Sequence, residues 1–240
     1  MRRRLTAPTF ILSSVRTGST LLRAILGSHS ELHAPHETHL GDITVGFESR
    51  QVARAMEGLG HTPRDLRFLL WDAVLAEELA RSGKRLLVNK SPNDVFIRDE
   101  IVECWPDARF VFLVRHPSAI LRSWRVARPY LEREQHVADI VRYCEAVEEA
   151  RGELDGPTVR YEDLIRDPVG TVSGLCDFLG VPWEEDMLDY GEAGTGSFVP
   201  GLGDWLEKIH TGRIQRVLDT PEPAPPRLKD VCLAWGYSPG

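Results

Sequence analysis

Five consecutive residues near the N-terminus have the side chains of a loop that binds phosphate or sulfate: Arg16, Thr17, Gly18, Ser19 and Thr20. An apolar run precedes them at positions 10–13 and a helical pattern follows at 21–26, so the sequence predicts a strand, a tight turn and a helix. The N–H groups at a helix N-terminus lack intrahelical partners and attract anions. Glycine lets the backbone approach a ligand closely, while the guanidinium and hydroxyl groups donate further hydrogen bonds. We therefore expect this loop to bind an anionic group.

A second candidate anion site follows about a hundred residues later. Residues 109–114 form an apolar run typical of a strand buried on both faces in a parallel sheet. Arg115 comes next, and Pro117 suits the first position of a helix, where its missing N–H needs no partner. Ser123 lies about two turns into that helix. Open α/β sheets bind ligands at the carboxyl ends of their strands, so we expect Arg115 at that edge, although a surface salt bridge is an equal alternative for the lone arginine.

Together the two segments resemble the nucleotide site of sulfotransferases that use 3'-phosphoadenosine 5'-phosphosulfate (PAPS). In that family the first loop holds the 5'-phosphosulfate. An arginine and a serine at the spacing of Arg115 and Ser123 hold the 3'-phosphate. The loop is related to the Walker A motif but differs from it, because Walker A places a lysine after its second glycine and here the cation precedes Gly18.

Three further segments extend the resemblance over residues from about 9 to 216. Lys90 follows an apolar run at 86–89 and begins a sequence similar to the family's internal Lys-Ser/Thr-Pro turn. Tyr161, a candidate cofactor-binding residue by this resemblance, begins a Tyr-Glu-Asp-Leu sequence that we expect at the end of a strand. A helix from about 169 to 179, which Gly180 closes, should follow. A late basic loop resembles the segment that closes over the 3'-phosphate, and its candidate cofactor-binding residues are Lys208, Thr211, Gly212 and Arg213.

The resemblance implies an α/β fold of three layers, in which helices flank a central, mostly parallel, P-loop-like sheet. The length of 240 residues suits one such domain, so we interpret 1–240 as a single sulfotransferase domain with a loose leader at 1–8. Apolar residues at helical spacing predict two helices in 44–82, split near 60–63, and a long helix at 131–154. By resemblance, the segment 44–82 is an insertion that borders the acceptor pocket.

The resemblance also implies a mechanism in which an acceptor hydroxyl attacks sulfur in line with the leaving group. Positioning of the reactants and stabilisation of charge then provide most of the rate enhancement. Arg16 would stabilise the leaving phosphate by charge, because arginine is a poor proton donor. Glu37 is the candidate base, with a pKa raised by partial burial, unless it is a surface carboxylate. His39 is the alternative base. Lys90 would contact the sulfate or orient the base, and its alternative is a solvated lysine at a strand end.

Charge and apolar patterning exclude several classes of protein. The net charge of −7 argues against nucleic acid as a partner. No apolar stretch approaches the ~20 residues of a membrane span and no signal peptide is present, so we expect a cytoplasmic protein. The four cysteines are far apart, which predicts buried thiols instead of disulfides or zinc ligands. PAPS-dependent transfer needs no metal, and the histidines at positions 29, 33, 36 and 39 lack a metal-binding spacing.

The acceptor is the least determined part of the prediction. The resemblance to sulfotransferases of bacterial secondary metabolism implies a small-molecule hydroxyl acceptor, including a polyketide hydroxyl on an acyl carrier protein. Among the other acceptor classes, we rank a carbohydrate hydroxyl second and a protein tyrosine last. Two other functions stay open: a non-catalytic protein that binds 3'-phosphoadenosine nucleotides, and a P-loop-type small-molecule kinase that uses ATP and magnesium. The sequence leaves the oligomeric state and the pathway open.

Overall fold

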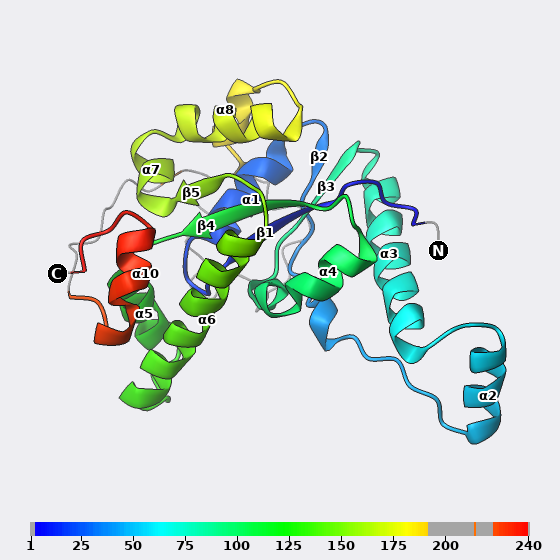
Figure 1. Cartoon of the computed structure of the whole chain (residues 1–240). Coiled ribbons are helices and arrows are strands. Elements are labelled where there is room, and N and C mark those ends of the chain that lie inside the picture. The colour runs from blue at the N-terminus through cyan, green and yellow to red at the C-terminus, as the bar shows by residue number, and fades with distance from the viewer. Residues whose placement is uncertain (1–2, 192–213, 215–222, 240) are drawn as a thin grey trace.

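A parallel sheet of five strands runs through the middle of the molecule in the order β2-β3-β1-β4-β5 (Figure 1). The computed structural model describes residues 3–191, 214 and 223–239. The strands are β1 Thr9–Ser13, β2 Leu32–His33, β3 Leu86–Asn89, β4 Arg109–Val114 and β5 Thr158–Arg160. The strands predicted at 10–13, 86–89 and 109–114 are therefore confirmed.

Helices cover both faces of the sheet. One face carries α1 Ser19–Ser28, α7 Tyr161–Arg166 and α8 Pro168–Leu179. The other face carries α3 Pro63–Ser82, α4 Arg98–Cys104, α5 Pro117–Ala127, α6 Arg133–Glu153 and α10 Lys229–Ala234. Short 3-10 helices are η1 Leu40–Asp42, η2 Pro92–Ile97, η3 Glu185–Leu188 and η5 Pro226–Leu228. Figure 1 shows α7 and α8 on one side of the sheet and α4 and α6 on the other, which confirms the predicted three-layer α/β fold.

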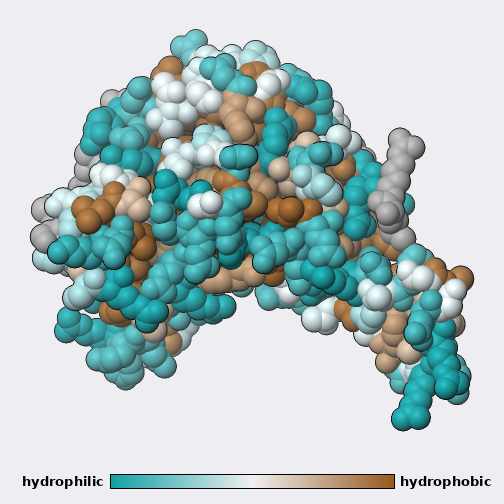
Figure 2. Space-filling model, in the orientation of Figure 1, coloured by the Kyte–Doolittle hydropathy of each residue, from teal (hydrophilic) through white to brown (hydrophobic). Residues whose placement is uncertain are grey.

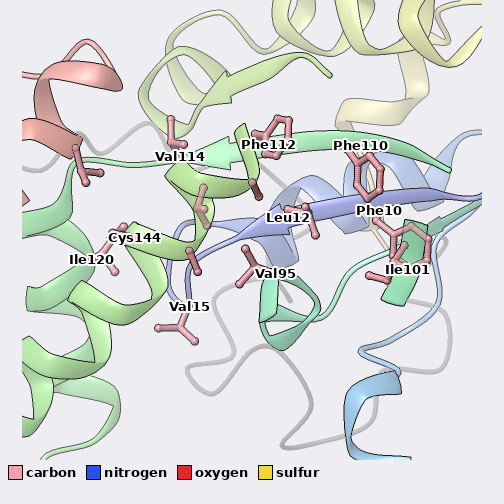
Figure 3. Close-up of a cluster of buried hydrophobic side chains, with 14 of the residues drawn as sticks. Phe10, Leu12, Val15, Val95, Ile101, Phe110, Phe112, Val114, Ile120 and Cys144 are labelled. Atoms are coloured by element: carbon pink, nitrogen blue, oxygen red, sulfur yellow. The ribbon is translucent and has the colours of Figure 1, made fainter. Parts of the chain in front are cut away.

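The two central strands are buried on both faces because their side chains alternate between the two helical layers. Phe10 and Leu12 of β1 belong to one hydrophobic cluster, while Ile11 belongs to the cluster on the opposite face. β4 alternates in the same way, and Leu12 pairs with Phe112 across the two strands. Figure 3 shows Phe10 and Leu12 beside Phe110 and Phe112 in the shared cluster. The apolar runs read from the sequence therefore correspond to strands packed between two layers.

Tyr161 begins a helix and does not lie at the end of a strand, contrary to our prediction. β5 ends at Arg160, which pairs with Val114, the last residue of β4. Residue 161 therefore has no neighbouring strand to pair with, and the chain turns into α7, whose Leu164 is buried. The next helix, α8, ends as predicted at Gly180, which has the left-handed φ of 72°.

The segment 3–8 is docked on the body of the molecule, so the prediction of a loose leader is wrong for these residues. The N–H groups of Arg4 and Leu5 donate to the Asp72 carboxylate of α3 at 2.7 and 3.1 Å. Asp72 is buried and also accepts a hydrogen bond from Trp105 Nε1 at 2.9 Å. A buried carboxylate needs donors, and the N-terminal segment supplies two of them.

The two helices predicted in 44–82 are α2, Arg50–Gly58, and α3. α3 packs on the core through Phe68, Trp71 and Leu75. α2 has no buried residue, and Figures 1 and 2 show it projecting from the rest of the molecule. The helical spacing of its apolar residues thus indicated the helix correctly but did not correspond to a buried face.

Other elements agree with the sequence. The long helix predicted at 131–154 is α6. The four cysteines are buried and free, which confirms the predicted thiols. Within the described ranges, no helix combines the length and the apolar character needed to cross a membrane.

The substitution Leu12→Ala tests the two-sided burial of β1. Leu12 has 0% exposure, so its truncation leaves a cavity between sheet and helices, and we expect the free energy of unfolding to fall by about 2–5 kcal/mol. The control Leu59→Ala truncates a side chain that is 67% exposed and should change it by less than about 0.5 kcal/mol. Urea denaturation followed by circular dichroism measures both. Equal losses would contradict the core position of β1.

Candidate active site

The loop between β1 and α1 is shaped by two residues with positive φ. Arg16 has a φ of 60°, and Gly18, the N-cap of α1, has a φ of 90°. Thr17 closes the turn by donating its hydroxyl to the Ser14 carbonyl at 2.9 Å. The first turn of α1 contains no acidic residue, so the N–H groups and the positive end of the helix dipole favour an external anion.

The Tyr161 ring explains why position 18 requires glycine. The ring lies directly against Gly18, where a Cβ atom would come within 2.6 Å of Tyr161 Cε2. A residue with a side chain would also rarely adopt the φ of 90°. Tyr161, which we predicted to contact the cofactor, therefore forms one wall of the predicted phosphosulfate loop.

Two hydrogen bonds join the two predicted anion sites. Arg16 Nε donates to Ser123 Oγ of α5 at 3.1 Å. Arg115 Nη1 donates to the carbonyl of Arg16 at 3.1 Å. The Arg115 guanidinium also lies over the Tyr161 ring, 4.3 Å from its centroid. The loops after β1, β4 and β5 therefore converge at one end of the sheet.

The loops meet between two neighbouring strands whose following helices pack on opposite faces of the sheet. β1 and β4 are neighbouring strands, but α1 packs in the cluster around Ile11, whereas α5 packs in the cluster around Leu12. In parallel α/β sheets, this reversal opens a crevice at the carboxyl ends of the strands, and ligands bind there. The 14–18 loop and Arg115 lie at this point of the sheet.

A chain of ionisable side chains adjoins the first loop. Lys90, which follows β3, contacts the Glu37 carboxylate and lies 3.5 Å from the Thr20 hydroxyl. On its other side, Glu37 Oε2 lies 3.3 Å from His39 Nε2. Side-chain exposure rises outward from 1% at Lys90 to 10% at Glu37 and 34% at His39. Lys90 is therefore not the solvated lysine that we considered, but a buried cation linking Glu37 to the N-terminus of α1.

The pKa of Glu37 differs from our expectation. Burial alone would raise this pKa, as predicted, but hydrogen bonds from His39 and Lys90 and the charge of Lys90 lower it to about 2. The hydrogen bond to Glu37 in turn raises the pKa of His39 above its ordinary value. Burial lowers the pKa of Lys90, and the Glu37 charge opposes that shift. The expectation of a raised Glu37 pKa failed because it took burial into account without the two cationic partners.

Sequence reasoning did not assign four buried polar residues around Glu37 and His39 to the site: Arg23, Asn89, Ser91 and Asp94. Two signals could have indicated them. Arg23 interrupts an apolar helix, where a charge needs a partner. The pattern Ser91-x-x-Asp94 ahead of apolar residues is the pattern of a helix start, which predicts that both side chains are engaged with backbone.

Part of the predicted site lies outside the described residues, namely Lys208, Thr211, Gly212 and Arg213. Their contact with a 3'-phosphate stays a prediction. Among the described residues, no group of three or more His, Cys, Asp or Glu side chains could hold a metal ion. Independence from metal likewise stays a prediction.

Comparison with known protein sequences gives a family match over most of the chain. A model of the sulfotransferase family matches residues 8–185. The nodulation protein NoeE of Sinorhizobium fredii is 29% identical over 207 residues, which cover 71% of this chain and 49% of NoeE. The chain thus spans about half the length of that relative.

Two solved structures superpose on nearly the whole chain. The sulfotransferase domain from the Synechococcus PCC 7002 olefin synthase has a TM-score of 0.73 and 25% identity, and covers 99% of this chain and 98% of that domain. The sulfotransferase domain from the curacin biosynthetic pathway has a TM-score of 0.72 and 23% identity, with coverage of 98% and 99%. Both share the α/β architecture described above.

The substitution Gly18→Ala tests the contact between the first loop and Tyr161. A methyl group would overlap the ring and a side-chain-bearing residue would have to hold a φ of 90°, so we expect anion affinity to fall about 10–100-fold. Calorimetric titration with 3'-phosphoadenosine 5'-phosphate (PAP) measures the change. The control Gly58→Ala adds a methyl group that, beyond its own helix, has no atom of the described residues within 4 Å, and it should leave the affinity unaltered. Wild-type affinity in Gly18→Ala would show that this contact does not shape the site.

Proposed function

Because the chain belongs to the sulfotransferase family, we propose that it transfers the sulfuryl group of PAPS to a hydroxyl of a small-molecule acceptor. The observation that carries the proposal is the junction of two anion sites, in which Arg16 bonds to Ser123 and Arg115 bonds to the Arg16 carbonyl. PAPS bears a 5'-phosphosulfate and a 3'-phosphate on one ribose. Two cationic loops side by side at one sheet edge suit such a ligand.

In this proposal the 5'-phosphosulfate binds at the N-terminus of α1. The backbone of the loop, the Arg16 guanidinium and the hydroxyls of Ser19 and Thr20 would donate hydrogen bonds to it. Arg115 and Ser123 would bind the 3'-phosphate. Protein cations would thus neutralise the transferred group, which is why we propose transfer without a metal.

Transfer then requires a base for the acceptor hydroxyl, and we propose Glu37. The acceptor oxygen forms a bond to sulfur while the bond from sulfur to the bridging oxygen breaks, PAP leaves, and Glu37 takes the hydroxyl proton. Arg16 stabilises the charge on the leaving phosphate. The hydrogen bond to Glu37 raises the pKa of His39, and this shift disfavours the neutral imidazole that a base requires, which supports Glu37 over His39.

Lys90 connects the proposed base to the donor site. Its ammonium contacts Glu37 and lies 3.5 Å from the Thr20 hydroxyl, at the N-terminus of α1. A sulfuryl group held there would place a second anion beside the ammonium and draw the cation toward the donor. The pKa of Glu37, about 2 beside Lys90, would then rise, and the carboxylate would become a stronger base.

The acceptor that we propose is a metabolite hydroxyl, including one carried on an acyl carrier protein. The likeness to a sulfotransferase domain from an olefin synthase supports a small molecule. We also propose that 1–240 acts as one domain and that α2 and α3 border the acceptor. The four buried, free cysteines fit a reducing compartment, which supports the cytoplasm as the location.

The donor is tested by titration with PAP, ATP and AMP in the presence of EDTA. We expect tight binding of PAP alone, because only PAP carries the 3'-phosphate. Arg115→Ala should weaken PAP binding about 10–100-fold by removing a charged donor. The control Arg166→Ala removes an exposed arginine of α7 that pairs with Asp163, and should leave PAP affinity unaltered. Equal affinity for PAP and AMP would contradict the proposal and favour a P-loop kinase or an unrelated anion site.

The base is tested by Glu37→Gln. We expect the turnover of PAPS with the hydroxyl compound that the wild type sulfates best, from a panel of sugars and 3-hydroxyacyl thioesters, to fall about 10²–10³-fold. PAP affinity should stay within about twofold, which shows that the variant is folded and binds the nucleotide. The control Glu185→Gln changes an exposed carboxylate of η3, outside the proposed donor and acceptor sites, and should leave turnover unaltered. Full turnover in Glu37→Gln combined with its loss in His39→Gln would assign the base to His39.

A further inference from the structure

The segment that carries Glu37 and His39 belongs to no strand or helix. It runs from residue 34 to residue 39, between β2 and η1, and its first two residues are buried. The backbone N–H and C=O groups of such a segment do not take part in the regular hydrogen bonds of a helix or a sheet. Where they are buried away from water, they still need hydrogen-bond partners. The side chains that supply those partners therefore determine where Glu37 and His39 lie.

Two buried side chains hold this segment from opposite ends. Arg23 Nη1 of α1 donates to the carbonyls of Ala34 and Pro35 at 3.0 and 3.4 Å. Ser91 Oγ accepts the N–H groups of Thr38 and His39 at 2.9 and 3.0 Å. A single hydroxyl thus fixes two successive peptide groups directly after Glu37.

Ser91 is in turn held by a closed ring of hydrogen bonds. Its N–H donates to Asp94 Oδ2 at 3.2 Å, and Asn89 Nδ2 donates to the same oxygen at 2.7 Å. Thr38 Oγ1 donates to Asn89 Oδ1 at 2.9 Å, which returns the ring to the 34–39 segment. Asn89, Ser91 and Asp94 have no exposed surface, so water does not compete for these bonds.

Two features of the ring are unfavourable by themselves. His39 has a φ of 47°, a left-handed conformation that a residue with a side chain holds only when its surroundings impose it. Within the part of the chain that the structure describes, Asp94 Oδ1 is buried without a hydrogen-bond partner, and burial raises the pKa of this carboxyl to about 7. Strain and an unpaired buried oxygen weaken a fold, so a gain in stability does not account for this arrangement.

We infer that Asn89, Ser91 and Asp94 are positioning residues for the Glu37–His39 pair. They fix the backbone of Thr38 and His39, and this places the Glu37 carboxylate between the Lys90 ammonium and the His39 imidazole. The inference rests on the proposed function to the extent that it gives Glu37 the role of base. Among the described residues, the hydrogen bonds of these three side chains lead to the 34–39 segment and to one another. Their removal should therefore slow transfer without weakening nucleotide binding.

Ser91→Ala tests this inference, because it removes the acceptor of both N–H groups. We expect the turnover number to fall about 10–100-fold, while PAP affinity stays within about twofold. We also expect the pKa of the His39 imidazole, measured by NMR titration and assigned by the loss of its signal in His39→Gln, to fall toward the ordinary value of 6.5. Glu37, Asp42 and Asp94 are the charged groups that raise it in the folded protein.

Ser28→Ala is the matched control. The Ser28 hydroxyl also bonds to two backbone groups, the carbonyls of Ile25 and Met187. Ser28 is the last residue of α1, whereas Lys90 lies beside Thr20 at the first turn of that helix. It should change neither turnover nor the His39 pKa. If Ser91→Ala does not fold, Thr38→Val removes one bond of the ring from the segment itself and should shift both readouts in the same direction by a smaller amount.

An unaltered His39 pKa with unaltered turnover in Ser91→Ala would overturn the inference. So would a loss of turnover no larger than that of Ser28→Ala. The His39 titration and PAP binding are both read without turnover. A wild-type protein that transfers no sulfuryl group would therefore contradict the proposed function, while the His39 pKa would still decide whether Ser91 positions the pair.

Discussion

The in-register pairing of β1 with β4 fixes the position of most of the candidate site. The strands pair from Thr9 with Arg109 to Ser13 with Leu113, so both end at the same level of the sheet. The two loops that follow therefore begin side by side, and Arg16 reaches Ser123. β3 pairs with β1 on its other edge and brings Lys90 to the same end. Three strands thus gather side chains that are far apart in the sequence.

Glu37 balances the positive charge that this arrangement concentrates. Lys90 and Arg23 are both buried, and an unpaired charge in such surroundings is strongly unfavourable. Burial lowers the pKa of each, and the Glu37 carboxylate opposes that effect at both. Arg16 and Arg115 add two further cations at this end of the sheet. A polyanionic ligand entering there would relieve repulsion between cations as well as form new bonds.

Features encoded in consecutive residues could be predicted from the sequence. The 16–20 loop, the strand at 109–114 and the helix boundary at Pro117 are local patterns, and the structure confirms each of them. The end of β5 could not be predicted locally, because it depends on where β4 stops. The pKa of Glu37 could not be predicted either, since it depends on Lys90, which the pairing of β3 brings close. The ring through Asn89, Ser91 and Asp94 was missed for the same reason: its contacts with Thr38 cross between elements.

The bond from Arg16 to Ser123 joins residues 107 positions apart, and this has a consequence for how the site forms. Contacts of such separation close large loops and form late, because chain entropy is lost before any contact energy is gained. During synthesis the first loop leaves the ribosome well before α5 exists. A ligand that needs both loops can therefore bind only a chain in which β1 and β4 are paired and α5 has formed. The free energy of binding then stabilises the fold that carries both loops against unfolding, instead of one loop alone.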